Sequence, residues 1–343
     1  MNLPKIAIVV INLNEKKLLK NCLDSLNKNS YPKDKIRIIV VDNGSSDSSL
    51  KFLKEKTKVT LISNSSNLGF AKANNQGIER ALKDKKVKYI ITLNNDTEVE
   101  KSWLKNLINF MDKNKGVGIA AGKMLKLKKK DIIDSAGDYF SKLNYRVVNR
   151  GSYDNDRGQY EKTEEALSAC AAASIIRREV LIDCKIGNEF FDEDFVSYIE
   201  DVDLNIRARL LGWKSSYVPS AIVYHVGSAT FSKMSLEIKE YYSRRNRILM
   251  AIKNFPIKQM SYLLYKYVLP SKKGLSYYPL KKGNVNKSET KKLSFKDATL
   301  VQLRAIAGAL KLLPAIIKKR HEIAEKKKID DREVERWFKD LTI

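Results

Sequence analysis

Cysteine is scarce in this sequence, and its spacing excludes two common architectures. The 343 residues contain three cysteines, Cys22, Cys170 and Cys184, and no two of them form a CxxC pair. An odd number of widely separated cysteines predicts neither a disulfide framework nor a structural zinc site, which fits a reducing cytosol. We expect all three to be small core residues.

Long apolar runs and the common nucleotide-loop signatures are also missing. No continuous apolar run reaches the ~18 residues that a transmembrane helix requires, so we expect no such helix. The apolar start at residues 6–11 is too short for a signal peptide or a membrane span. The chain has neither GxGxxG nor GxxxxGKS/T, which disfavours a dinucleotide dehydrogenase and a P-loop NTPase.

Positive charge is abundant and unevenly placed. The net charge is +25, and the stretch from Arg244 to the C-terminus holds 25 Lys and Arg against 9 Asp and Glu. A basic segment that follows a less basic body suggests an anionic partner, either a membrane surface or a nucleic acid. A generally Lys-rich composition is the alternative explanation.

The first 120 residues alternate β-branched apolar runs with segments of helical spacing. Short continuous apolar runs predict buried strands, and apolar residues three or four positions apart predict helices. Strands that alternate with helices imply an α/β fold with a mostly parallel sheet and right-handed crossovers. The predicted strands cover residues 6–11, 36–41, 59–62, 89–93 and 117–121.

Three of these strands end in polar clusters, at Asn12, Asp42 and Asp96. Open α/β sheets bind ligands at the carboxyl ends of their strands. Asn94 and Asp96 offer an amide oxygen and a carboxylate two residues apart, on one side of an extended chain. A hard cation that carries a diphosphate uses one or two carboxylates of this kind. The alternative is that residues 94–97 form only a turn and a helix cap.

A second acidic cluster, Glu200, Asp201 and Asp203, falls in the first turn of a predicted helix that ends near Gly212. The helix dipole stabilises acids there by ~0.3–1 kcal/mol each, which accounts for one or two of the three. A carboxylate held at a helix N-terminus and facing a cleft is also a well-positioned general base.

Two further polar features follow. His225, one of only two histidines, ends a predicted extended run at 221–224 and precedes a Gly-Ser turn. This position favours a metal or phosphate role, although a lone His is more often a satisfied core or surface residue. Arg244, Arg245 and Arg247 precede an apolar helix and could pair with a diphosphate. Residues 138–159 predict loops and short edge strands, either an acceptor site or irregular surface.

Taken together, these segments resemble the inverting glycosyltransferases of family 2, which have the GT-A fold. The resemblance is greatest to the rhamnosyltransferase-like members that build bacterial and archaeal surface glycans. It covers residues 5 to about 250, in the order typical of the family. The matching segments are residues 9–14, 41–47, 67–77, 93–97, 200–204, 225–228 and 241–247.

The resemblance implies a fold and a set of roles. The fold would be a Rossmann-like nucleotide-binding sheet with an acceptor subdomain. Asp201, the second acid of the pair with Glu200, would be the catalytic base. Asp96 would ligate Mg²⁺ or Mn²⁺, and His225 would reach the metal or the diphosphate.

The remaining implied roles concern the nucleotide. Asp42 would contact the base, and Asn94 would stand at the first position of the DXD motif of the family. Asn at that position departs from the motif and leaves fewer acidic ligands for a metal. The implied nucleotide-binding residues are Asn12, Asp42, Gly69, Lys72, Asn94 and Arg244.

The composition predicts two regions, a GT-A domain at 1–255 and a basic, amphipathic helical extension at 256–343. Within the extension, Leu300, Leu303, Leu310 and their neighbours fall on one helical face up to Pro314. A basic amphipathic helix is typical of a membrane-surface element. Packing of this helix on the catalytic domain is the alternative. Residues 271–294 are rich in Lys, Gly and Ser and predict a mobile linker.

The expected function is transfer of a sugar from a nucleotide-diphosphate donor, dTDP-rhamnose or a UDP-sugar, to a hydroxyl of a glycan or lipid-linked acceptor. The expected location is the cytoplasm, peripheral on the inner face of the cell membrane. A catalytically inactive scaffold of a glycan-assembly complex is one alternative. A basic nucleic-acid-binding protein is another, but no recognised module interleaves aromatic and basic residues here, and we expect no nucleic-acid partner.

Overall fold

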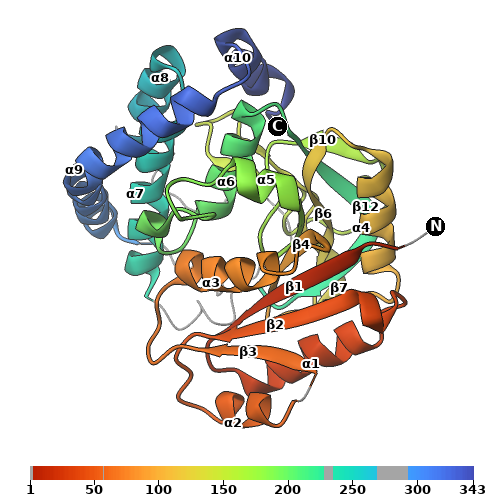
Figure 1. Cartoon of the computed structure of the whole chain (residues 1–343). Coiled ribbons are helices and arrows are strands. Elements are labelled where there is room, and N and C mark those ends of the chain that lie inside the picture. Colours follow the sequence, from red (N-terminus) through yellow and green to blue (C-terminus); the bar gives the residue numbers. More distant parts are fainter. Residues whose placement is uncertain (1–2, 57, 228–234, 269–292) are drawn as a thin grey trace.

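The computed structural model describes residues 3–56, 58–227, 235–268 and 293–343. Its strands and helices alternate in the first half, and its last third is helical (Figure 1). The strands are β1 (Lys5–Asn12), β2 (Ile36–Asp42), β3 (Val59–Ser63), β4 (Val87–Asn94), β5 (Thr97–Val99), β6 (Val117–Lys126), β7 (Lys129–Ser135), β8 (Asp138–Phe140), β9 (Val147–Asn149), β10 (Glu164–Ala166), β11 (Ala173–Arg177) and β12 (Lys214–His225).

The helices surround the sheet and extend beyond it (Figure 1). Two short 3₁₀ helices cover Lys33–Lys35 and Glu193–Phe195. The α-helices are α1 (Lys16–Asn27), α2 (Ser49–Lys54), α3 (Phe70–Leu82), α4 (Trp103–Lys113), α5 (Arg178–Asp183), α6 (Glu200–Leu210), α7 (Leu236–Asn254), α8 (Ile257–Val268), α9 (Phe295–Lys326) and α10 (Asp331–Asp340).

A ten-stranded sheet forms the centre, in the order β10-β12-β6-β11-β4-β1-β2-β3, with β5 beside β12 and β7 beside β6. The predicted parallel arrangement holds for β4, β1, β2 and β3. Their apolar side chains are buried because helices cover both faces of this part of the sheet. The other half is mixed, since β11 runs antiparallel to both β4 and β6.

The strand register brings the predicted polar ends to one edge. Asn12 at the end of β1 lies opposite Asp42 at the end of β2, and Ile11 lies opposite Asn94 at the end of β4. Parallel neighbours end at the same edge, so three residues far apart in the sequence become close in space.

The cysteines occupy the positions expected of core residues. Cys22 and Cys184 are buried, Cys170 is partly exposed, and all three are free thiols. Burial raises the pKa of the Cys22 and Cys184 thiols to about 12, so both stay protonated at neutral pH.

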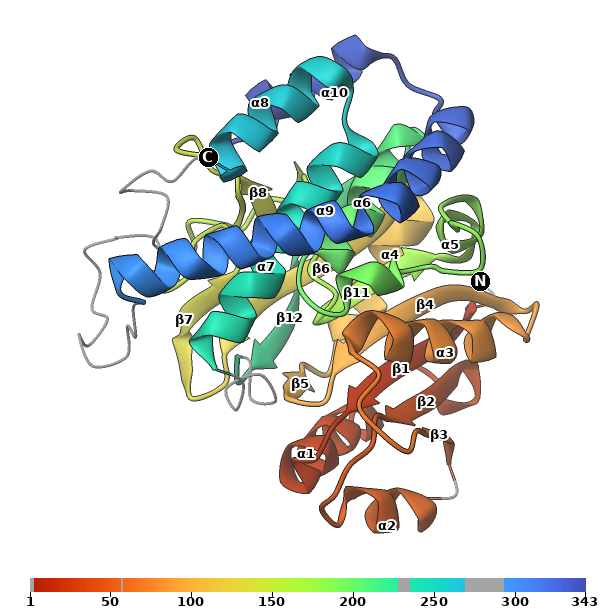
Figure 2. The ribbon, with the colours of Figure 1, turned by 90° about the vertical axis from the view of Figure 1, so that its left-hand side faces the viewer.

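The C-terminal extension packs against the body of the protein. Figure 2 shows α9 crossing α7, and one apolar cluster contains Leu249 of α7, Ile316 of α9 and Trp337 of α10. Ion pairs add to this contact, because Lys319 on α9 pairs with Glu189 at 3.0 Å and with Asp194 at 2.9 Å. The apolar cluster contains residues that precede and residues that follow position 255. The boundary between a GT-A domain and an extension at that position therefore stays a prediction.

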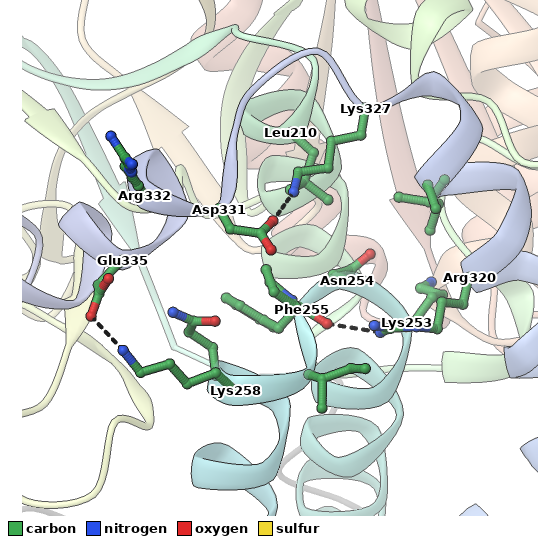
Figure 3. A pocket seen from close by; sticks show the side chains of 15 residues that line it. Leu210, Lys253, Asn254, Phe255, Lys258, Arg320, Lys327, Asp331, Arg332 and Glu335 are labelled. Atoms are coloured by element: carbon green, nitrogen blue, oxygen red, sulfur yellow. Dashed lines mark hydrogen bonds and ion pairs between the residues drawn. The ribbon is translucent and has the colours of Figure 1, made fainter.

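Figure 3 shows the groove where the extension meets the body. Lys258 on α8 pairs with Glu335 on α10 at 3.0 Å, and Lys327 pairs with Asp331 at the start of α10. Arg320 on α9 donates to the carbonyl of Phe255 at 2.8 Å. These contacts hold α8, α9 and α10 together.

Helix α9 differs from its prediction in length and in the face that it buries. It continues through Pro314 to Lys326. Its buried residues are Ala298, Val301, Gln302, Ala305, Ala309, Ile316 and Ile323, whereas Leu303 and Leu310 are 60% and 62% exposed. By length and composition α9 could cross a membrane, although the sequence predicted no transmembrane helix. The predicted linker at 271–294 lies, except for its last two residues, outside the described residues.

Candidate functional site

A cavity of about 350 Å³ opens at the edge where β1 and β4 end. Ligand sites of small molecules have volumes of this order. Its floor includes Asn94, Asn95 and Asp96, which follow directly on one another. Its other lining residues are Ile11, Leu13, Asn43, Asn67, Leu68, Gly69, Phe70, Val196, Ser197 and Tyr242.

A network of amide and carboxylate side chains lies beneath this cavity. Asn12 donates from Nδ2 to Asp42 Oδ1 at 2.8 Å, and its own Oδ1 accepts from Asn95 Nδ2 at 2.8 Å. Asp42 is fully buried and also accepts from the backbone and the hydroxyl of Ser45. Asn12 and Asp42 therefore lie at the strand ends where the sequence predicted them. Their side chains bind one another and the turn after β2. The neighbouring Asn43 is the residue that lines the cavity.

Gly69 forms one wall of the cavity. Its φ of +87° lies in the region that only glycine adopts without strain, and a Cβ there would come within 2.9 Å of the Val196 carbonyl oxygen. That carbonyl accepts hydrogen bonds from the backbone of Phe70, at 2.8 Å, and of Ala71. Gly69 thus allows the start of α3 to contact the loop that leads into α6.

Asp96 and His225 meet at the end of β12. The imidazole Nε2 of His225 lies 3.2 Å from Asp96 Oδ1, and its Nδ1 lies 2.7 Å from Asp134 Oδ2. Asp134 in turn forms an ion pair with Lys126. Burial alone lowers the pKa of His225, but the carboxylates of Asp134 and Asp96 outweigh it and raise the pKa to about 10. A protonated His225 thus supplies positive charge that the two buried carboxylates require.

This corner fits a divalent cation that is carried by a diphosphate. Nε2 of His225 is buried and lies 3.2 Å from Asp96 Oδ1, and Asp134 fixes the ring through the other nitrogen. A carboxylate that orients a His in this way is a common feature of metal sites. In the described part of the chain, no three His, Cys, Asp or Glu side chains converge to hold a metal by themselves. Ligands from outside the protein would therefore have to complete the coordination. Asp96 and His225 would hold the ion together with phosphate oxygens and water, and the imidazole would give up its Nε2 proton on binding, because His ligates metals in the neutral form.

Asp201 lies in the first turn of α6 and is partly exposed. Its Oδ2 accepts from the backbone N–H of Ala171 at 3.0 Å, and Oδ1 from that of Val202 at 2.8 Å. Burial raises the pKa of Asp201, and these hydrogen bonds only partly oppose it. The ionised Asp201 is therefore a stronger proton acceptor than an ordinary aspartate, as a general base requires. The adjacent Glu200 is 5% exposed, and burial followed by the charge of Asp201 raises its pKa well above the usual value.

Four predicted nucleotide-binding residues do not line the cavity: Asn12 and Asp42, which lie beneath it, and Lys72 and Arg244. Lys72 on α3 is half-exposed and lies 3.5 Å from Glu193. Arg244 on α7 faces α9, where it donates to the Ala298 carbonyl at 3.1 Å and pairs with Glu240 at 2.8 Å. The residue that α7 contributes to the cavity is Tyr242.

Sequence reasoning missed four residues of this region: Asn43, Asn95, Asp134 and Tyr242. Asn43 and Asn95 each adjoin a residue that was identified, so extending the strand-end argument by one position would have found them. Asp134 carries no such signal, because it lies on an edge strand without a recognisable motif.

A second cavity of about 450 Å³ lies in the groove of Figure 3, between α8, α9 and α10. Of the cations that line it, Lys253, Lys258 and Lys327 form ion pairs with acidic side chains, and Arg320 donates to backbone carbonyls. These groups already bind protein acceptors, and no predicted site residue lines the groove. The cavity beside Asp96 is therefore the better candidate for the active site.

Comparisons with known proteins bear on the family and the fold. Two curated relatives match part of the chain: an uncharacterized glycosyltransferase of Haemophilus influenzae, 28% identical over 117 residues, and a poly(ribitol-phosphate) beta-glucosyltransferase of Bacillus spizizenii, 34% identical over 124 residues. The matches cover 33% and 35% of this chain, and only 34% and 19% of the relatives.

Three solved structures share the fold at low sequence identity. GalNAc-T7 with UDP, GalNAc and Mn²⁺ has a TM-score of 0.61 at 16% identity, over 78% of this chain and 52% of its own. The mannosyltransferase PcManGT of Pyrobaculum calidifontis, with GDP-Man and Mn²⁺, has 0.53 at 14%, over 92% and 76%. Residues 1–349 of S. aureus TarS with UDP have 0.54 at 19%, over 98% and 91%.

The fold is thus of the GT-A type, as the sequence predicted. The family model for glycosyl transferase family 2 matches residues 7–184, from β1 to the end of α5. This span is more than half of the chain and contains the strand ends, Gly69 and Asp96. The protein therefore belongs to glycosyltransferase family 2.

Proposed function

We propose that the protein is an inverting glycosyltransferase that moves a sugar from a nucleoside-diphosphate donor to a hydroxyl of a glycan or lipid-linked glycan. The observation that carries this proposal is the contact of Asp96, which lines the cavity, with His225, which Asp134 holds through its other ring nitrogen. It offers a buried carboxylate and an imidazole where a parallel sheet ends, which is where nucleotides bind in α/β folds.

In this mechanism Asp201 acts on the acceptor. The ionised carboxylate takes the proton of an acceptor hydroxyl as the hydroxyl oxygen attacks the anomeric carbon. The new C–O bond forms on the face opposite the diphosphate, and the bond from the anomeric carbon to the diphosphate oxygen breaks, which inverts the configuration. The backbone N–H groups of Ala171 and Val202 hold Asp201 in place for this step.

Asp96 and His225 act on the leaving group. A divalent ion held by these two residues, Mg²⁺ or Mn²⁺, would supply Lewis-acid stabilisation of the departing diphosphate. Asn94, which lines the same cavity, would add an amide oxygen or N–H to the donor contacts.

The first experiment identifies the nucleobase of the sugar donor. The rhamnosyltransferase-like resemblance favours dTDP-rhamnose, whereas two structural neighbours hold UDP and one holds GDP-Man. Thermal-shift measurements of the whole chain with UDP, dTDP and GDP, each with Mn²⁺, Mg²⁺ or EDTA, are expected to show one nucleotide that stabilises strongly and only with metal. A ligand at 100 times its Kd stabilises the folded state by about 2.7 kcal/mol. No metal-dependent shift with any nucleotide would instead favour the inactive-scaffold alternative.

We place the protein in the cytoplasm, peripheral on the inner face of the membrane, through the outer face of α9. On this face Leu303, Leu310 and Ile317 are exposed and follow one another at seven-residue intervals. Arg304, Lys311 and Lys318 repeat beside them and are exposed as well. An exposed apolar stripe flanked by cations fits an anionic lipid surface, where each Lys or Arg contributes about 1 kcal/mol.

Flotation with vesicles tests this face. We expect the protein to float with anionic phosphatidylglycerol vesicles and not with phosphatidylcholine vesicles, and the double variant Leu303→Gln, Leu310→Gln to lose binding at least roughly tenfold. Leu143→Gln, which changes a leucine that is 57% exposed elsewhere, is the matched control. Equal flotation of the double variant and the wild type would refute this membrane surface.

A further inference from the structure

The loop at residues 195–199 connects the donor cavity to the helix that carries the proposed base. Val196 and Ser197 line the cavity, and Ile199 directly precedes α6, two positions before Asp201. The carbonyl of Val196 also accepts hydrogen bonds from the backbone at the start of α3. The conformation of this loop therefore sets one wall of the cavity and the position of the first turn of α6.

The backbone conformation of this loop is unfavourable for the residues that it contains. Val196 has φ +62° and ψ −62°, and Tyr198 and Ile199 both have φ +72°. Residues other than glycine seldom adopt a positive φ, and β-branched residues such as valine and isoleucine do so least. Such a conformation persists only where surrounding groups hold it. The loop therefore needs contacts that fix its backbone.

Asn246 on α7 supplies such contacts. Its side chain is fully buried, and its Nδ2 donates to the carbonyls of Phe195 at 2.8 Å, Ser197 at 2.9 Å and Tyr198 at 2.7 Å. These carbonyls belong to the peptide groups next to the positive-φ residues Val196 and Tyr198. The two N–H bonds of one amide are thus shared among three carbonyls of the loop.

Arg245 fixes the orientation of this amide. Its Nε donates to Asn246 Oδ1 at 3.0 Å, so that Nδ2 faces the carbonyls of the loop. Nη2 of Arg245 also donates to the carbonyls of Asp194 at 2.5 Å and Phe195 at 3.3 Å. Arg245 thus holds the residues where the loop begins, and Asn246 is the residue of this pair that reaches positions 197 and 198.

Building on the proposed function, we propose that Asn246 is a positioning residue for both the donor and the base. Its amide keeps the loop at 195–199 in the positive-φ conformation. In this conformation Val196 and Ser197 form the cavity wall, and α6 begins where Asp201 can act on the acceptor. Asn246 does not itself line the cavity, so it acts through the loop and makes or breaks no bond with the substrate.

The first test is Asn246→Ala in the full chain, assayed well below its unfolding temperature with metal and whichever of UDP, dTDP and GDP the wild type binds. Without the amide the loop can relax. We expect Kd for the nucleotide to rise roughly tenfold and kcat to fall roughly tenfold, because small displacements of positioned groups cost large factors in rate.

Asn29→Ala is the matched control. Asn29 is also a buried amide that donates to a backbone carbonyl, that of Glu100 at 3.2 Å, and it does not line the cavity. This variant should lower the unfolding temperature and leave Kd and kcat as in the wild type.

A double-mutant cycle distinguishes positioning from general stabilisation. Tyr198→Gly places a residue that adopts positive φ without strain at a position whose side chain does not line the cavity. The loop should then depend less on Asn246. We expect the loss of nucleotide affinity on Asn246→Ala to shrink from roughly tenfold to roughly threefold in the Tyr198→Gly background. A residue that only stabilises the fold would lower the unfolding temperature and leave Kd unchanged.

Asn246→Ser keeps the proposal testable if Asn246→Ala fails to fold. A serine hydroxyl has one hydrogen to donate, in place of the two of the amide, so this variant should show the same two effects at smaller size. Equal Kd and kcat in the wild type and the Asn246 variants would overturn the proposal. A loss of the same size with and without Tyr198→Gly would overturn it as well.

The wild-type measurements separate this inference from the function on which it rests. A wild-type chain that binds none of the three nucleotides with metal would refute the donor site, and with it any positioning of that site. Metal-dependent binding that is equal in the wild type and Asn246→Ala, with equal kcat, would refute the role of Asn246 alone.

Discussion

Asp201→Asn should abolish sugar transfer while the donor still binds. The amide keeps the size and the hydrogen-bond geometry of the carboxylate at the start of α6, so the contact with the Ala171 N–H can persist. It cannot take the proton of the acceptor hydroxyl. Because a positioned base contributes ~10²–10⁴-fold in rate, kcat should fall by that factor, measured as nucleoside-diphosphate release in the presence of acceptor.

Donor affinity distinguishes a chemical role of Asp201 from a structural one. The thermal shift with the donor nucleotide and metal should equal that of the wild type, because the cavity beside Asp96 is unchanged. Glu79→Gln, an exposed acid on α3, serves as the control and should keep full activity. If Asp201→Asn loses nucleotide binding together with activity, Asp201 supports the fold of the site and is not its base.

Asp96→Ala should remove the metal-dependent part of donor binding. In the wild type Asp96 is 4% exposed, lines the cavity and lies 3.2 Å from His225 Nε2. Without this carboxylate the ion would keep one protein ligand instead of two. We expect the metal-dependent thermal shift to disappear and turnover to fall about 10³-fold, since Lewis-acid stabilisation of the leaving group is worth several kcal/mol.

Two measurements make this expectation specific. Nucleotide binding in EDTA should be the same in wild type and Asp96→Ala, because only the metal contribution is removed. Glu55→Ala, which changes an exposed acid next to α2, should behave as the wild type. A metal-dependent shift that survives in Asp96→Ala would show that the ion binds elsewhere, and the corner of Asp96 and His225 would then be structural.

Much of the donor half was predictable because its pattern is local. Buried parallel strands are nearly continuous apolar runs, so the ends of β1, β2 and β4 are visible in the sequence as the points where polar residues begin. The geometry of a parallel sheet then places Asn12, Asp42 and Asn94 at one edge. Gly69 was expected through the resemblance to the family, and its positive φ explains why glycine stands there.

Side-chain direction on a helix was not predictable in the same way. The sequence suggested Arg244 for the diphosphate, yet Tyr242 lines the cavity and Arg244 faces α9. Two positions along a helix of 3.6 residues per turn point in nearly opposite directions. The rotation of α7 about its axis decides between them, and that rotation is set by packing against α9.

Contacts between distant elements were equally invisible in the sequence. Asp134 holds His225, and the segment at 167–171 links Asp138 to Asp201. Neither Asp134 nor Asp138 belongs to a motif, and β7 and β8 are short edge strands whose composition resembles a loop. Their positions depend on antiparallel pairing, which no local pattern specifies.

The sequence by itself determined the fold class, the edge of the sheet at which the site lies, and the chemical types of Asp96, Asp201 and His225, because strand periodicity and strand ends are encoded locally. The tertiary structure alone decided which side chains face the cavity and which carboxylate orients His225. These depend on helix rotation and on pairing between distant segments, so they are properties of the packed chain and not of any single stretch of it.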